Sequence, residues 1–164
     1  MTPPMEAALR VGIGFDLHRL VEGRPCILGG IEFDHPTGPS GHSDGDAVLH
    51  AISDAVLGAA GLDDLGSLFP DTDAAWKDAD SGALLTECMR RVTEAGWRPV
   101  NLDLVIATEG PRIAPRRADM RARIGELVGL DPDAVNVKGK TLEGMGALAE
   151  GRGVAVQAVV LLTR

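Results

Sequence analysis

Residues 10–19 alternate strictly between two kinds of residue, and this alternation constrains the fold more than any other feature of the chain. Apolar residues stand at the odd positions from Val11 to Leu17, while the even positions hold two glycines, then Asp16 and His18. Successive side chains of a strand point to opposite faces, so the pattern predicts a strand with one apolar face. The other face becomes polar where the strand ends.

The rest of the chain predicts four further strands and three helices. Apolar and β-branched runs indicate strands over residues 26–33, interrupted by Gly29 and Gly30, and over 100–107, 135–138 and 154–162. Apolar stripes at helical spacing indicate helices over residues 46–60, 82–95 and 115–128. We predict an α+β fold, a two-layer sandwich in which a mixed sheet of four to five strands carries helices on one face.

Composition narrows the functional classes. The chain has 164 residues, enough for one domain, and we expect a short tail over residues 1–9 followed by a single domain over 10–164. A net charge of −8 and 3% aromatic residues argue against a nucleic-acid partner or an anionic membrane surface. Cys26 and Cys88 stand among apolar neighbours, and we see neither a signal peptide nor a membrane span. These features predict a cytoplasmic protein.

Residues 61–79 form a segment without clear periodicity that carries five aspartates. Loops of this length inside a compact domain are usually functional or disordered. The apolar residues Leu68 and Phe69 favour a segment that docks on the domain. Ligand contact and plain solvated surface remain two open interpretations.

Asp16 and His18 lie two positions apart on the predicted strand, so both can point to one ion. His50 interrupts an otherwise aliphatic helix and is a candidate third ligand. Two imidazoles and one carboxylate leave one open position on a tetrahedral Zn²⁺, as in catalytic sites. His50 could equally be a hydrogen-bonded core histidine, and Asp46 could sit at the third helical position with Ser43 as N-cap.

Residues 41–46 place two glycines, His42 and two carboxylates in the turn that opens this helix. A helix N-terminus with free N–H groups can bind phosphate. A simple turn capped by Ser43 explains the same residues except His42. The sequence does not decide between these two interpretations.

Four blocks, in order, resemble the family of 2-C-methyl-D-erythritol 2,4-cyclodiphosphate synthases. They are residues 10–18, residues 41–46 leading to His50 and Asp54, residues 68–73 with 79–81, and residues 135–138 followed by Thr141 and Glu143. Together they cover nearly the whole chain from residue 10 to residue 162.

The resemblance implies closure of 4-diphosphocytidyl-2-C-methyl-D-erythritol 2-phosphate into a cyclic diphosphate, with release of CMP. The substrate's own 2-phosphate would be the nucleophile, so the protein positions and neutralises charge. It further implies Zn²⁺ on Asp16, His18 and His50, and Mg²⁺ or Mn²⁺ on Glu143. Thr141, Glu143 and His42 are the implied catalytic residues.

Substrate contacts also follow from the resemblance. The methylerythritol side is assigned to His42, Ser43, Asp64, Gly66, Phe69, Asp71 and Asp73. The cytidine side is assigned to Thr108, Arg112, Ile113, Ala114, Gly139, Lys140 and Thr141. Asp46 and Asp54 are expected behind the metal ligands, with Asp54 fixing an imidazole tautomer. The family assembles as homotrimers, with the sheets facing the axis and each active site lying between subunits.

The chain departs from the family at three places. Residues 139–143 read Gly-Lys-Thr-Leu-Glu where the family usually has Ala-Thr-Thr-x-Glu, and Arg112 replaces a usual lysine. In the loop over residues 146–153 an aromatic residue is lost at Ala147, and Glu150 and Arg152 have exchanged places. In the family those residues line an axial cavity that can hold an isoprenoid diphosphate, so we expect such binding to be weak or absent.

Two other functions are compatible with the motifs. A metal-dependent phosphohydrolase would use the same ions to activate water and would give a linear product. A non-catalytic metal-bound trimer would only bind nucleotide or isoprenoid.

Overall fold

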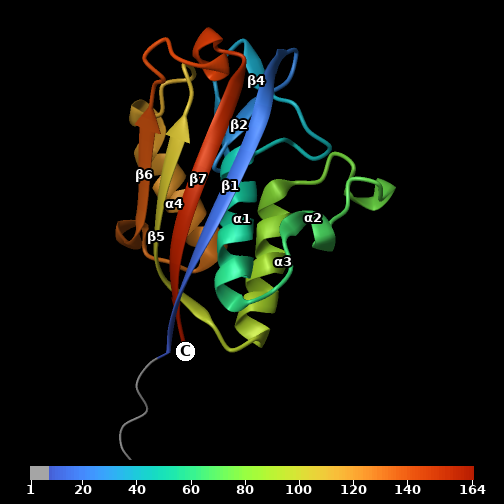
Figure 1. Ribbon diagram of the computed structural model, residues 1–164, viewed down its shortest axis with the longest axis vertical. Helices are drawn as coiled ribbons and strands as arrows, with labels where there is room; N and C mark the ends of the chain where they lie inside the picture. The colour runs from blue at the N-terminus through green and yellow to red at the C-terminus, as the bar shows by residue number, and fades with distance from the viewer. Residues whose placement is uncertain (1–7) are drawn as a thin grey trace, which may run out of the picture.

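A computed structural model describes residues 8–164 and shows an α+β fold built on a five-stranded mixed sheet (Figure 1). The strand order is β4-β1-β7-β5-β6, in which β5 and β6 are parallel and the other neighbours antiparallel. The α+β prediction with a mixed sheet is confirmed. The strands are β1 (Leu9–Glu22), β4 (Thr37–Pro39), β5 (Arg98–Ala107), β6 (Val135–Lys140) and β7 (Gly153–Thr163).

The interrupted strand predicted over residues 26–33 is instead a separate hairpin of β2 (Cys26–Leu28) and β3 (Ile31–Phe33). Gly29 and Gly30 form its turn with φ of 65° and 71°. Two consecutive residues with positive φ are what a tight two-residue hairpin turn requires. The two glycines therefore reverse the chain. Strand β4 was not predicted, because three residues containing Gly and Pro carry no strand pattern.

The helices are α1 (Ala47–Ala60), α2 (Leu65–Leu68), α3 (Ser81–Glu94) and α4 (Arg117–Val128). Figure 1 shows α1 beside β1, with α3 next to it. The predicted N-cap of α1 is wrong, because Asp46 and not Ser43 accepts the N–H groups of Val48 and Leu49, each at 3.1 Å. Helix α4 begins later than predicted because a 3₁₀ turn occupies Ala114–Arg116.

Helix α1 packs against the glycine face of β1. A Cβ atom added to Gly14 would lie 1.8 Å from the carbonyl oxygen of Ala51, and one added to Gly12 would lie 2.0 Å from that of Ala55. Only glycine permits this approach of strand and helix backbones. The apolar side chains on the opposite face of β1 are exposed, 69% for Val11 and 62% for Phe15.

Other predictions concern the ends and the cysteines. Most of the predicted tail over residues 1–9 lies outside the described residues, and β1 already includes Leu9. Cys26 and Cys88 are buried and unpaired, as expected. Over residues 8–164, no helix combines the length and hydropathy needed to cross a bilayer.

We expect Gly14→Ala to destabilise the fold by about 3 kcal/mol or more, because the new methyl group meets helix backbone that cannot rotate away. Chemical denaturation measures this change. Gly58→Ala is the matched control, since Gly58 lies in α1 with no atom within 4 Å of the added Cβ. That variant should gain up to about 1 kcal/mol. Equal effects of the two variants would contradict the close contact.

Candidate metal centre

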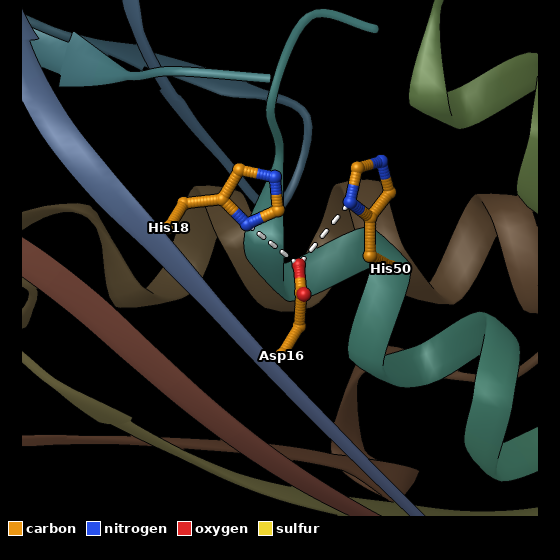
Figure 2. A group of neighbouring side chains, drawn as sticks. All are labelled: Asp16, His18 and His50. Atoms are coloured by element: carbon orange, nitrogen blue, oxygen red, sulfur yellow. Dashed lines mark hydrogen bonds and ion pairs between the residues drawn. The ribbon is translucent and has the colours of Figure 1, made fainter. Parts of the chain in front are cut away.

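Asp16 and His18 of β1 converge with His50 of α1 on one point beside the sheet (Figure 2). The Oδ2 atom of Asp16 lies 2.9 Å from His18 Nδ1 and 3.2 Å from His50 Nδ1. One ligating atom from each residue lies within 4.8 Å of the other two. Among the described residues this is the one cluster of three or more His, Cys, Asp or Glu with such spacing.

The three side chains fit a divalent cation. Ligand atoms on a tetrahedral Zn²⁺ lie about 3.4 Å apart, close to the two distances from Asp16 Oδ2. His18 Nδ1 is buried and makes no hydrogen bond, because its contact with Asp16 is an ion pair without hydrogen-bond geometry. A buried nitrogen that makes no hydrogen bond costs free energy unless something binds its lone pair. A cation between the three residues would do so and keep a fourth position open.

The charges in the cluster also favour a cation. Burial raises the pKa of Asp16, but the contacts with His18 and His50 outweigh burial and hold this pKa at about 2. Burial lowers the pKa of His50, but the Asp16 carboxylate outweighs it and raises this pKa above its ordinary value of 6.5. Asp16 is therefore ionised at neutral pH and attracts positive charge to the imidazoles.

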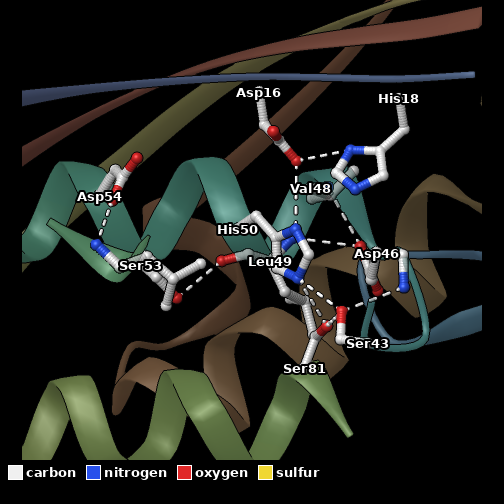
Figure 3. A network of polar contacts seen from close by, with 12 residues as sticks. Asp16, His18, Ser43, Asp46, Val48, Leu49, His50, Ser53, Asp54 and Ser81 are labelled. Atoms are coloured by element: carbon white, nitrogen blue, oxygen red, sulfur yellow. Dashed lines mark hydrogen bonds and ion pairs between the residues drawn. The ribbon is translucent and has the colours of Figure 1, made fainter. Parts of the chain in front are cut away.

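On its other side, His50 contacts two hydroxyl groups (Figure 3). Its Nε2 atom lies 2.9 Å from Ser81 Oγ and 3.1 Å from Ser43 Oγ. Sequence reasoning assigned no role to Ser81, which belongs to α3 and lies 31 positions further along the chain. The only sequence signal was its place in the family-like block over residues 79–81.

The Asp46 carboxylate forms hydrogen bonds with the helix that carries His50 and none with the imidazole ring. Its side chain is fully buried and accepts the N–H groups of Gly29 at 2.8 Å and Gly30 at 2.7 Å, besides those of the first turn of α1. Burial raises the pKa of Asp46 to about 6, although these amides oppose the shift. Asp46 therefore joins the β2–β3 turn to the start of α1.

The tautomer hypothesis for Asp54 is contradicted by the structure. The Asp54 carboxylate accepts a hydrogen bond from the N–H of Leu65 at 2.8 Å, and none from an imidazole. It thereby attaches the first turn of α2 to α1. Burial raises the pKa of Asp54 above its ordinary value, although the Leu65 hydrogen bond opposes the shift.

A pocket of about 240 Å³ opens beside the metal ligands. Helix α2 and the loop after it bring one wall of the pocket to His50, and the turn before α1 brings another. Asp64 is not part of the wall, since it caps α2 through the N–H of Ser67 at 2.7 Å. Asp73 meets His42 through its carbonyl oxygen, 3.4 Å from Nε2. The predicted substrate residues in the wall are His42, Ser43, Gly66, Phe69 and Asp71.

A second pocket, of about 180 Å³, lies where β5 and β6 end, and it shares no lining residue with the first. Glu109 and Arg117 also line it. Glu143 lies beside it, where its carboxylate accepts a hydrogen bond from Thr141 Oγ1 at 3.1 Å, and it is not in the cluster of Asp16. The predicted cytidine-side residues in this wall are Thr108, Arg112, Ile113, Ala114, Gly139, Lys140 and Thr141.

Comparison with known proteins gives one consistent family. The sequence pattern of the YgbB family matches residues 9–163. A 2-C-methyl-D-erythritol 2,4-cyclodiphosphate synthase of Chromobacterium violaceum is 55% identical over 155 residues, which cover 94% of this chain and 98% of the relative. A solved structure of such a synthase with CDP bound is 41% identical with a TM-score of 0.86, over 93% of this chain and 99% of that one.

A longer solved protein also matches. The bifunctional IspDF of Campylobacter jejuni is 37% identical, with a TM-score of 0.92 over 96% of this chain. The match covers 43% of that longer protein. The likeness therefore extends over this whole chain and over less than half of the bifunctional protein.

We expect Asp16→Asn to lower the His50 pKa in metal-free protein, because burial then acts without the main opposing carboxylate. Histidine proton NMR across a pH series measures this pKa. Since the folded-state pKa is raised, the pair stabilises the metal-free fold below about pH 6.5, and this contribution disappears as the pH rises through the folded value. Asp103→Asn, on the sheet beside Lys138, is the control. An unchanged His50 pKa in Asp16→Asn would show that the Asp16 carboxylate is not the cause of the raised pKa.

Proposed function

The chain belongs to the YgbB family, and from this premise we propose that it converts 4-diphosphocytidyl-2-C-methyl-D-erythritol 2-phosphate into 2-C-methyl-D-erythritol 2,4-cyclodiphosphate with release of CMP. The observation that carries the proposal is the convergence of Asp16, His18 and His50 beside a pocket lined by predicted substrate residues. The step belongs to isoprenoid precursor biosynthesis.

We propose Zn²⁺ as the ion of this centre, because two imidazole nitrogens and one carboxylate are its usual catalytic ligands. When bound, zinc supplies Lewis-acid polarisation of a phosphate oxygen. His42, on the pocket wall, would bind the methylerythritol part. The substrate carries its own nucleophile, so these groups align its 2-phosphate with the β-phosphorus and exclude water.

The second pocket is proposed to hold the cytidine diphosphate part. Arg112, Arg117 and Lys140 bring three positive charges to its wall, against the carboxylate of Glu109. Thr141 would hold the diphosphate by its hydroxyl group, and Glu143 beside it would bind Mg²⁺ or Mn²⁺. A divalent cation there would offset the repulsion between the phosphates and Glu143.

We propose a homotrimer whose sheets face the axis, with helices on the outer side and each active site between two subunits. Two observations support it. First, β1 exposes an apolar stripe of the kind that is usually buried at a subunit interface; its residues are Leu9, Val11, Ile13, Phe15 and Leu17. The two pockets of one chain share no lining residue, as expected if each completes a site with a neighbour's pocket. Residues 10–164 would act as one catalytic domain, and the free cysteines favour the cytoplasm.

Phosphorus NMR tests the proposed reaction directly. Purified protein with Zn²⁺, Mg²⁺ and the substrate should give a cyclic diphosphate together with CMP. A linear diphosphate or free phosphate with CMP would mean hydrolysis and would refute the synthase. If zinc-loaded protein gives no turnover, the synthase proposal is also refuted, and a non-catalytic binding protein is favoured.

His18→Ala should remove stoichiometric zinc and turnover while the oligomer persists, because His18 supplies one of three ligands. Metal analysis and light scattering measure both properties. His35→Ala is the control for zinc content, since His35 contacts Thr37 outside the cluster. Dissociation of the oligomer by His18→Ala would instead indicate a structural metal.

Geranyl diphosphate at micromolar concentration should not raise the melting temperature. Arg152 is the cation left in the altered loop, and it is paired with Glu150 at 2.8 Å, so less positive charge remains for a diphosphate. Thermal denaturation measures binding by mass action. The exchange Glu150→Arg with Arg152→Glu restores the family order and should gain stabilisation. Stabilisation of the unchanged protein would show the expectation to be wrong.

A further inference from the structure

Behind His50, polar contacts continue to Ser81 and Asp44, away from the metal side. The Ser81 hydroxyl group lies 2.9 Å from His50 Nε2 and also donates a short hydrogen bond to the Asp44 carboxylate. Ser81 is 1% exposed, so water does not compete for these contacts. Figure 3 shows Ser81 and Ser43 below the ring and Asp16 above it.

The direction of each hydrogen bond follows from the carboxylate at the end. The Ser81 hydroxyl group donates its single proton to the Asp44 side chain. The Ser81 oxygen then presents lone pairs to the ring, and a proton on His50 Nε2 satisfies them. This contact favours a proton on Nε2. In the metal-free site Asp16 Oδ2, 3.2 Å from Nδ1, competes for that proton, whereas a cation between the three residues would need the lone pair of Nδ1 that the Ser81 contact favours.

Asp44 is itself firmly held. Its Oδ1 atom accepts the N–H of Asp46 at 3.0 Å, and its Oδ2 atom accepts the N–H of Ser81 at 3.0 Å. Asp44 therefore joins the N-terminal ends of α1 and α3. The Ser81 hydroxyl group therefore joins His50 to a carboxylate that two backbone N–H groups hold, and these contacts orient the imidazole ring.

We propose that Asp44 and Ser81 are positioning residues that hold His50 in the tautomer and orientation needed to bind the metal through Nδ1. The inference rests on the proposed metal centre and deepens it, since neither residue lines the substrate pocket. A metal-binding histidine usually donates its other N–H to an oxygen acceptor, and loss of such a partner typically costs 10- to 100-fold in metal affinity or activity.

Ser81→Ala tests the proposal with zinc alone. We expect zinc affinity, measured by competition with a chromogenic chelator, to fall about 10- to 100-fold. Long-range proton–nitrogen NMR of the metal-free protein at a pH where His50 is neutral should show a smaller Nε2-protonated fraction than in the unchanged protein, because the Asp16 contact with Nδ1 is then opposed less strongly. Ser53→Ala is the matched control, because Ser53 is a buried serine of α1 whose hydroxyl group bonds to the Leu49 carbonyl oxygen instead. It should change neither measurement.

Two further variants separate positioning from a general structural role. Ser81→Thr keeps the hydroxyl group and should restore affinity and tautomer. Asp44→Asn should weaken zinc binding, because a neutral amide no longer commits the Ser81 proton away from His50. Asp80→Asn is its control, since Asp80 caps the same helix through the N–H of Gly82 at 2.7 Å without reaching His50.

The tests of His50 positioning can be distinguished from the test of the proposed reaction. Unchanged zinc affinity and tautomer in folded Ser81→Ala would overturn the inference, and would identify Ser43, at 3.1 Å, as the sufficient partner. Equal losses in Ser53→Ala would overturn it as well. Zinc affinity and tautomer are measured without substrate, so a protein that fails to make the cyclic product still decides this inference.

Discussion

The contact between the backbones of β1 and α1 is the constraint on which the rest depends. Gly12 and Gly14 lie against the carbonyl oxygens of α1, which brings strand and helix closer than side chains would permit. Asp16 follows on the same face of β1, and His50 precedes Ala51, the residue that Gly14 meets. The packing that fixes the core therefore also fixes the distance between ligands contributed by two elements.

The sequence predicted those parts of the fold that a local pattern encodes. The alternation along β1 placed Asp16 and His18 on one face, and His50 was found because it breaks an aliphatic helix stripe. The alternation did not tell which face is buried. Burying the face with large apolar residues is the usual solution. The structure buries the glycine face instead, because the gain comes from the approach of α1 rather than from side chains of β1.

Roles set by tertiary contacts were not accessible from sequence. Asp46 was assigned to a helix position, but its carboxylate accepts the amides of a hairpin turn that lies 16 and 17 positions earlier in the chain. Asp54 stands one turn after His50, yet its hydrogen bond goes to Leu65. Ser81 reaches His50 from a different helix. In each case the polar group forms a hydrogen bond with a residue that only tertiary packing brings near. Sequence spacing therefore does not identify that residue.

The alternation along β1 gives the two faces of this strand different roles. Even positions give the helix contact and then two metal ligands, whereas odd positions give an exposed apolar stripe. Under the proposed trimer that stripe would be covered by other subunits, so a single strand would fix both the ligand geometry and the assembly that completes the site. A substitution on the odd face, such as Phe15 to a charged residue, would then act on turnover through assembly while zinc binding by one chain persists. A substitution at Asp16 would instead weaken zinc binding while the trimer persists, because it removes a ligand and leaves the apolar stripe in place.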